Sequence, residues 1–184
     1  KGIMPLLGKG SQYKHKDIEM PLSHYINLST WHRINMLYTP RSQNEIAALV
    51  REAAEPKLLQ RLMEVVENRK GHALLHCVET AKIALTGADE TVQDFSPAIN
   101  KLTKVRISRT MFEKAIAQPA ADIRKKVEDL LRMGGCMPDQ VNTVFFTGGT
   151  SVVPLVRAEI CAVVPNARVM DGDPMGAVGH GLAL

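Results

Sequence analysis

Residues 143–151 read Thr-Val-Phe-Phe-Thr-Gly-Gly-Thr-Ser, and this stretch decides the fold. A short apolar run such as 143–146 is typical of a buried strand. Two glycines let the backbone come close to a ligand, and a helix that starts after them offers unpaired N–H groups that attract phosphate. The alternative is a tight strand-to-helix turn capped by the hydroxyls of Thr150 and Ser151. The pattern is neither a Walker loop nor a Rossmann fingerprint, so both interpretations stay open at this point.

Helical and strand patterns extend outward from this stretch. Downstream, a helix that carries Val156 and Val163 leads to a predicted strand at 168–170, and residues 171–174 should open a final helix. Ser42 and Glu45 form a capping-box pattern upstream. The other upstream patterns predict helices over 28–37, from Ser42, from Pro56, over 71–85, over 108–116 and from Pro119 to 133, with strands at 91–95 and 104–108. The last third is therefore α/β, and the middle is mainly helical.

The composition is that of an ordinary soluble globular protein. The 184 residues are 45% hydrophobic and 23% charged, with a net charge of +4. Basic and acidic residues are mixed, which argues against a nucleic-acid-binding stripe. The sequence shows no apolar run of the roughly 18 residues that a membrane span needs. The three cysteines are scattered, which argues against a disulfide framework or a zinc site. Free cysteines of this kind favour the reducing environment of the cytoplasm.

The helix predicted over 71–85 carries most of the other polar candidates. His72, His76 and Glu79 share one face, which is compatible with a metal ion but more typical of a polar stripe. Lys82 follows Glu79 by three residues, which is the spacing of an ordinary ion pair. Cys77 lies among apolar neighbours and is expected in the core, and Val78 is expected to face inward beside it. The spacing alone predicts neither a metal site nor a catalytic pair.

Three segments resemble the heat-shock seventy (DnaK-like) chaperone family. Residues 144–156 are similar to its adenosine motif, an apolar strand followed by Gly-Gly-Ser/Thr and a helix with an early proline. Residues 77–86 resemble its Glu-x-x-Lys helix, and residues 173–183 resemble its final Asp-Pro helix. Residues 4–8, Met-Pro-Leu-Leu-Gly, look closest to the YegD-like branch. The segments keep the family's order, and the similarity is best over 70–184.

The resemblance implies an α/β fold, the second lobe of an actin-like ATPase. Residues 1–42, in which turn residues are frequent and periodicity is weak, should form a loop-rich opening segment. Residues 43–110 would form a helical outer subdomain with a small sheet. Residues 111–184 would form a ribonuclease-H-like inner subdomain. We therefore expect the chain to be a segment of a longer protein, whose N-terminal lobe completes the cleft.

The resemblance also implies that the ligand is ATP or ADP. Family members use one helix to hydrogen-bond the ribose and adenine, and a glycine turn to pass under the α-phosphate. A further acidic residue lies near the sugar or base edge. The corresponding residues here are Glu79, Lys82 and Thr86 on the helix, Gly148, Gly149 and Thr150 in the turn, and Asp173 as the acidic residue.

Two positions depart from the family pattern, and several parts of the pattern do not occur in this sequence. Family members usually place arginines where this chain has Ile83 and Val152, and these arginines sandwich the adenine ring. The sequence has no Asp-x-Gly-x-Thr hairpin, and the family's catalytic aspartates and phosphate-contacting lysine lie on the N-terminal side. We expect no catalytic residue and no metal ligand in this chain, with magnesium held elsewhere in the parent protein. The chain should therefore not hydrolyse ATP alone.

The resemblance favours a cytoplasmic chaperone ATPase whose partners include adenine nucleotide and a co-chaperone or client protein, without nucleic acid or membrane. One alternative is another actin-fold ATPase, such as a sugar-kinase-like protein or a reactivating factor. The other is a degenerate interaction module that keeps the fold without binding nucleotide. The aliphatic residues at 83 and 152 favour this last alternative slightly.

Overall fold

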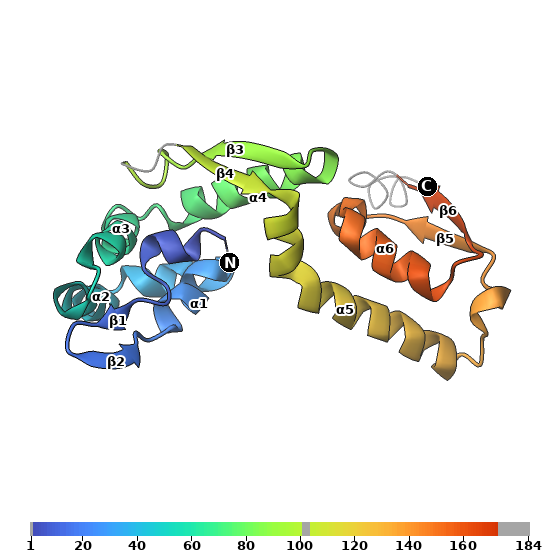
Figure 1. The fold of residues 1–184 in the computed structure, drawn as a ribbon, viewed down its shortest axis with the longest axis horizontal. Helices are drawn as coiled ribbons and strands as arrows, with labels where there is room; N and C mark the ends of the chain where they lie inside the picture. The colour runs from blue at the N-terminus through green and yellow to red at the C-terminus, as the bar shows by residue number, and fades with distance from the viewer. Residues whose placement is uncertain (1, 101–103, 173–184) are drawn as a thin grey trace. The chain divides into compact units, whose positions relative to one another are not determined.

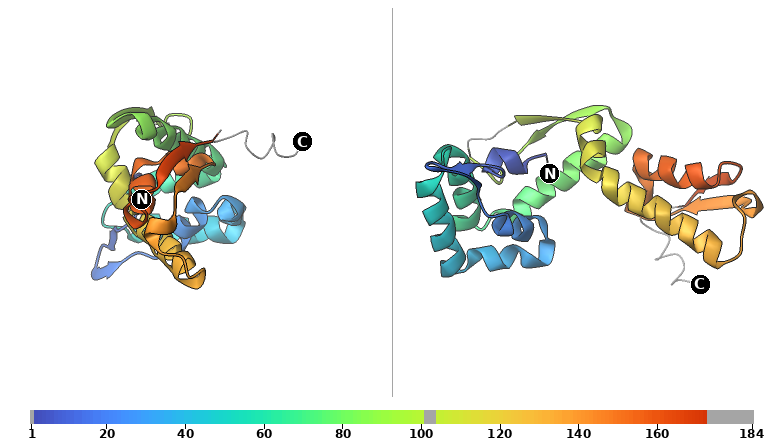
Figure 2. Two further views of the ribbon diagram at one scale, coloured as in Figure 1. Left: turned by 90° about the vertical axis from the view of Figure 1, so that its right-hand side faces the viewer. Right: turned by 60° about the horizontal axis from the view of Figure 1, so that its bottom comes forward.

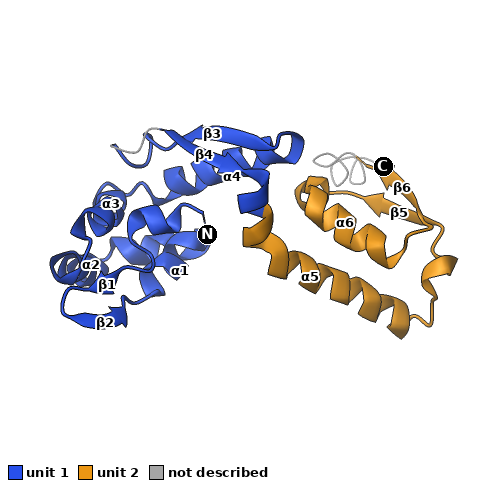
Figure 3. Cartoon of the chain, viewed as in Figure 1, with its two compact units in different colours: residues 1–112 blue, residues 113–184 orange. Residues whose placement is uncertain are grey.

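The computed structural model describes residues 2–100 and 104–172, which divide into two compact units, 1–112 and 113–184 (Figure 3). The described elements in chain order are η1 (Met4–Leu7), β1 (Gln12–Tyr13), β2 (Lys16–Glu19), α1 (Ser23–Ser29), η2 (Trp31–Tyr38), α2 (Pro40–Glu52), α3 (Pro56–Glu67), α4 (Gly71–Gly87), β3 (Glu90–Asp94), β4 (Lys104–Ser108), α5 (Arg109–Met133), η3 (Pro138–Gln140), β5 (Thr143–Phe146), η4 (Gly149–Val152), α6 (Pro154–Val163) and β6 (Arg168–Asp171) (Figure 1). Here η denotes a 3-10 helix. No helix among these residues is long and apolar enough to cross a membrane.

The first helices begin at different residues from those that the sequence predicts. The single helix predicted over 28–37 is wrong, because α1 and η2 are separate elements with Thr30 extended between them. The capping box at Ser42 is also wrong. Thr39 is the N-cap of α2, and its hydroxyl accepts a hydrogen bond from the Ser42 N–H at 3.3 Å. Pro40 occupies the first helical turn, where its missing N–H costs nothing, so the helix starts before Ser42.

The core of the first unit lies between the opening segment, α2, α3, α4 and the loop after β3. Its members are almost completely buried apolar side chains, among them Leu7, Leu28, Ile46, Leu62, Leu74 and Phe95. Pro56 begins α3, as the sequence predicts. Cys77 is confirmed as a core residue, whereas Val78 faces solvent, so its predicted inward position is wrong. The inward face of α4 runs through Leu74, Cys77, Ala81 and Leu85, the i, i+3, i+4 spacing of one helix face.

Gly71 lets α4 begin directly against the opening segment. Its N–H donates a hydrogen bond to the Tyr38 hydroxyl at 3.0 Å. A Cβ at this position would lie 2.6 Å from Ile34 Cγ2 and 2.8 Å from the Tyr38 hydroxyl. Glycine is therefore needed here because of a close approach rather than for a turn.

The outer strands form a hairpin beside α4. β3 and β4 pair antiparallel, with Glu90 opposite Ser108 and Asp94 opposite Lys104 (Figure 1). The alternation of exposed and partly buried residues along β4 confirms the half-buried strand predicted at 104–108. Arg109, directly after β4, donates a hydrogen bond to the Leu85 carbonyl at 3.1 Å, which ties the hairpin to the end of α4.

Pro119 lies inside α5 and does not end it. Ser108 caps this helix as expected, because its hydroxyl accepts the Met111 N–H at 3.2 Å. The predicted break between residue 116 and Pro119 is wrong, since α5 continues through the proline to Met133. Proline removes one backbone hydrogen bond, and the helix formers around it carry the helix on. Gly135, at φ 60°, then ends the helix in a Schellman motif, with Cys136 N–H donating to the Leu131 carbonyl at 3.0 Å.

The second unit contains a parallel pair of strands connected through α6. Thr143 lies opposite Arg168 in β5 and β6, and Phe146 lies opposite Asp171. Figure 2 shows α6 beside these strands. A parallel pair needs such a crossover, and it brings the carboxyl ends of both strands to the same edge. Of the predicted buried run, only Phe146 is buried, whereas Phe145 is exposed among the described residues.

One buried polar side chain stands apart in the first unit. His24 is almost completely buried, and its Nδ1 has no hydrogen-bond partner among the described residues. Its Nε2 lies 3.8 Å from Glu45 Oε2. Burial lowers the pKa of His24 below 6.5, and Glu45 opposes this shift only partly.

Candidate functional site

The polar residues predicted on α4 share one solvent-facing side of that helix. Lys82 Nζ lies 2.7 Å from Glu79 Oε1, and these side chains are 39% and 54% exposed. The Thr86 hydroxyl donates to the Ile83 carbonyl at 2.7 Å. An exposed ion pair of this spacing stabilises a helix by only a few tenths of a kcal/mol. Its carboxylate and ammonium groups are therefore accessible to a ligand at little cost in stability.

Ile83 supplies an apolar surface beside these polar groups. It is 61% exposed, and it follows Glu79 by one helical turn. An arginine here would offer a planar cation, whereas isoleucine offers an aliphatic surface against which a flat ring can pack. The α4 face thus combines a carboxylate acceptor, an ammonium donor, a hydroxyl oxygen and an apolar surface.

The glycine turn after β5 has a more irregular geometry than the sequence predicts. Gly148 adopts φ 82° and ψ 155°, a conformation that is essentially confined to glycine. The Ser151 hydroxyl and backbone N–H both donate to the Gly148 carbonyl, at 2.7 and 3.0 Å. Ideal Cβ atoms at Gly148 or Gly149 would meet no heavy atom of the described chain within 4 Å. As far as residues 2–100 and 104–172 are concerned, the backbone of this turn is therefore open to a ligand.

The helix predicted after residues 147–151, with a proline in its first turn, is confirmed as α6, but an unpredicted 3-10 helix precedes it. The short 3-10 helix η4 follows Gly148, and α6 begins only at Pro154. Ser151 uses its hydroxyl to close the turn, so it does not cap α6. Thr150 is exposed. If this turn meets phosphate, it does so through open backbone and the Thr150 hydroxyl rather than through the N-terminus of a long helix.

Sequence reasoning missed a polar cluster at the carboxyl ends of β5 and β6. Arg157 Nη1 lies 2.6 Å from Asp171 Oδ1 and donates to the Ser151 carbonyl at 3.5 Å. The Arg157 guanidinium carbon lies 4.3 Å from the centroid of the Phe146 ring. No local pattern connects these residues, because the parallel register of β5 and β6 brings them together.

The last predicted site residue, Asp173, lies outside the described residues. Gly172 precedes it, and its N–H donates to the Phe146 carbonyl at 2.9 Å. A Cβ at Gly172 would lie 2.5 Å from the Phe145 ring. The chain therefore leaves β6 in close contact with β5.

The structure brings the predicted residues together in two groups. Glu79, Lys82 and Thr86 lie on α4 in the first unit, and the Gly148–Thr150 turn belongs to the second. Within the described ranges, no group of three or more His, Cys, Asp or Glu side chains is arranged to hold a metal ion. His72, a candidate for such a group, packs its ring edge-on against Trp31 at a centroid distance of 4.6 Å.

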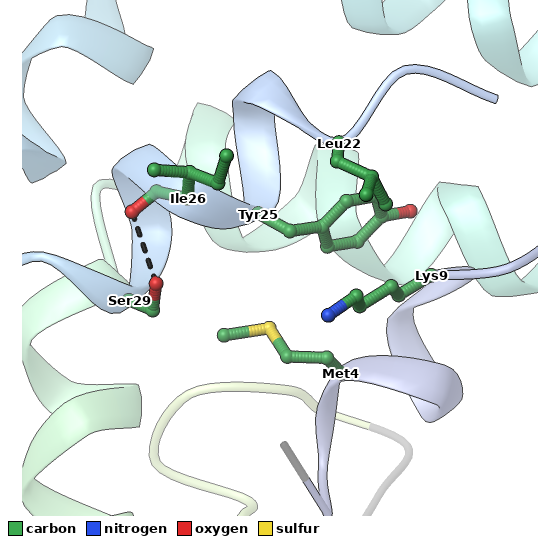
Figure 4. Close-up of a pocket in the computed structure, with 6 residues that line it drawn as sticks. All are labelled: Met4, Lys9, Leu22, Tyr25, Ile26 and Ser29. Atoms are coloured by element: carbon green, nitrogen blue, oxygen red, sulfur yellow. Dashed lines mark hydrogen bonds between the residues drawn. The ribbon is translucent and has the colours of Figure 1, made fainter. Parts of the chain in front are cut away.

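A small pocket in the opening segment is separate from both groups. Its volume is about 170 Å³, and its lining residues are Met4, Lys9, Leu22, Tyr25, Ile26 and Ser29 (Figure 4). The Tyr25 hydroxyl donates to the Leu7 carbonyl at 3.1 Å, and burial raises the pKa of Tyr25 to about 12. This tyrosine is therefore neutral and structural, and the pocket contains no predicted nucleotide contact.

Comparison with known proteins gives one family match. The family described as "Hsp70 protein" matches residues 48–184. A chaperone protein HscA homolog from Shewanella piezotolerans is 27% identical over 109 residues, 58% of this chain and 18% of that protein. A chaperone protein DnaK from Trichormus variabilis is 26% identical over 129 residues, 68% of this chain and 17% of that protein. The chain thus spans less than a fifth of the length of these two relatives.

Proposed function

We propose, because this chain belongs to the Hsp70 family, that it forms the adenosine-binding half of an ATP/ADP site in a chaperone ATPase. Family membership supports a chaperone ATPase segment with an actin-like fold over a sugar kinase or a reactivating factor. The division into an outer and an inner subdomain and the assignment to the YegD-like branch remain proposals. We also propose that the protein is cytoplasmic, and that its partners are the N-terminal lobe of the parent protein and a co-chaperone or client protein.

One observation carries this proposal, the exposed face of α4. The Glu79 carboxylate can accept hydrogen bonds from ribose hydroxyls, and Lys82 can donate to an adenine nitrogen. The Thr86 hydroxyl gives its proton to the Ile83 carbonyl, so its oxygen is left to accept a hydrogen bond from the ligand. Ile83 lies beside them with an exposed aliphatic side chain on which the ring can pack. The open turn at Gly148–Thr150 is the second contribution, and Asp173 remains a proposed contact at the sugar or base edge.

Hydrolysis by this chain alone is not part of the proposal. Phosphoryl transfer depends mainly on positioned charge and metal around the transferred phosphate. The sequence has no Asp-x-Gly-x-Thr hairpin, and none of the residues assigned here acts on the γ-phosphate. Magnesium and the catalytic groups would come from other parts of the parent protein.

Thermal melting with and without millimolar ADP and adenosine tests the proposal, in both the full natural protein and this 184-residue chain. A ligand at 100 times its Kd adds about 2.7 kcal/mol, which is several degrees of melting temperature. Glu79→Ala should abolish the shift. Glu67→Ala, which changes an exposed glutamate at the end of α3, should leave the shift intact.

The aliphatic residues at 83 and 152 favour a second candidate, an interaction module that no longer binds nucleotide. This candidate predicts that neither ligand shifts the melting temperature of the full natural protein. That result would refute the nucleotide-site proposal. A shift in the full protein but not in the 184-residue chain would mean that binding needs the rest of the protein.

A further inference from the structure

We propose that Arg157 is a positioning residue that holds the Gly148–Ser151 turn and neutralises Asp171 beside it, so that this edge accepts the phosphate end of a nucleotide. The inference rests on the proposed function and deepens it. It assigns a role to two residues outside the predicted site.

The contacts of Arg157 connect three segments at one edge of the second unit. Its Nη1 is 2.6 Å from Asp171 Oδ1 at the end of β6, and it donates to the Ser151 carbonyl in η4 at 3.5 Å. Its guanidinium carbon lies 4.3 Å from the ring centroid of Phe146 at the end of β5. The side chain is only 28% exposed, so these contacts restrict its orientation. Ser151 in turn hydrogen-bonds the Gly148 carbonyl, which connects the guanidinium to the glycine at positive φ.

The position of Asp171 explains why its charge matters. Asp171 lies opposite Phe146 in the parallel pair, and the Gly148–Gly149 turn follows Phe146 after one residue. Ligands of open α/β sheets bind outside the carboxyl ends of the strands. The Asp171 side chain is 66% exposed at that edge, and without a partner its carboxylate would repel phosphate. Arg157 removes this net charge while keeping the turn in place.

A purely structural role for Arg157 predicts a different outcome. If the residue only attaches α6 to the sheet, its loss should weaken adenosine and ADP binding equally. If it also neutralises Asp171, its loss should weaken ADP binding more, because only ADP carries phosphates. Removing the Asp171 charge at the same time should then restore much of the ADP affinity.

Calorimetric titration of the full natural protein with ADP and with adenosine tests this inference. We expect Arg157→Ala to weaken ADP binding about tenfold and adenosine binding less than about threefold, with the difference shrinking at high salt. Arg157→Lys should restore part of the loss, and Arg157→Ala/Asp171→Asn should bring ADP affinity to within about threefold of wild type. Arg124→Ala is the matched control. It removes an arginine that pairs with Glu159 on α6 at 3.4 Å and makes none of the Arg157 contacts, so both affinities should stay unchanged.

Three results would overturn the inference. The first is an Arg157→Ala protein with wild-type affinity for both ligands, and the second is an equal loss of both affinities without recovery in the double variant. In these two cases the nucleotide site stands and only the role of Arg157 fails. Wild-type protein that binds neither ligand refutes the proposed function itself, and the inference fails with it.

Discussion

Replacing Gly71 by alanine tests how closely α4 packs on the opening segment. Alanine stabilises an interior helical position relative to glycine by about 1 kcal/mol, and this is the upper limit of the gain at Gly71, the first residue of α4. Here the new methyl group would meet Ile34 Cγ2 at 2.6 Å, the Tyr38 hydroxyl at 2.8 Å and Leu28 Cδ1 at 3.4 Å. Ile34 and Leu28 are fully buried, so neither can move away into solvent. The two effects therefore oppose each other at one residue.

The packing term should be larger than the helix-propensity term. Forcing an extra methyl group into a filled core costs about 1–3 kcal/mol. Displacing the Tyr38 hydroxyl also lengthens the 3.0 Å hydrogen bond from the Gly71 N–H, and such a bond contributes about 1 kcal/mol. After the propensity gain is subtracted, Gly71→Ala should lower the free energy of unfolding by about 1–3 kcal/mol.

Urea unfolding followed by circular dichroism measures this change, and Gly87→Ala supplies the control on the same helix. A Cβ at Gly87 meets nothing within 4 Å in the described chain, so alanine there should leave stability unchanged or raise it by up to about 1 kcal/mol. If Gly71→Ala proves as stable as Gly87→Ala, the close approach of α4 to Ile34 and Tyr38 is wrong.

Three further predictions concern other residues. Burial lowers the pKa of His24, so below pH 6.5 the unfolded state binds more protons at this residue than the folded state does. The contribution of His24 to the free energy of unfolding should therefore be largest above pH 6.5 and fall as the pH drops from 6.5 through the lower folded pKa. Urea titrations at several pH values should show this slope, and His24→Gln should reduce it, whereas replacing the exposed His15 by glutamine should not. Burial also raises the pKa of the Cys77 thiol. In a protein whose other two cysteines are replaced by serine, this thiol should react slowly with a disulfide reagent in native buffer and promptly in denaturant. Equal rates under the two conditions would contradict its core position. Ile83→Arg should tighten ADP binding about fivefold by stacking on adenine, and an unchanged affinity would count against ring packing at this position.

Elements marked by local chemistry could be predicted from the sequence. Three such signals depend only on neighbouring residues: the apolar run at β5, the alternation along β4, and Pro56 at the start of α3. Two of the helix boundaries that the sequence predicted wrongly depend on competition between local signals. Thr39 with Pro40 caps α2 in place of Ser42, and Pro119 is tolerated because strong helix formers surround it.

Part of the candidate site could likewise be predicted from local spacing, and part of it depends on how the strands pair. Glu79 and Lys82 share a helix face because of their spacing, and the structure has them in contact. The conformation of Gly148 could be anticipated from glycine's freedom, but the 3-10 helix after it could not. Arg157 and Asp171 meet only because β5 and β6 pair in parallel with Phe146 opposite Asp171, and a residue-by-residue reading of the sequence does not give that register.

The residues on the outer face of α4 contribute little to the stability of the fold. The Glu79–Lys82 pair is exposed and contributes little to folding, and the exposed Ile83 gains little from burial. The opposite side of the same helix, with Leu74, Cys77 and Leu85, already supplies the burial that holds α4 in place. Stability therefore does not require this combination of carboxylate, ammonium and aliphatic groups on the outer side. A ligand with a flat ring and sugar hydroxyls would use all three, which is why loss of the Glu79 carboxylate should affect nucleotide binding far more than folding.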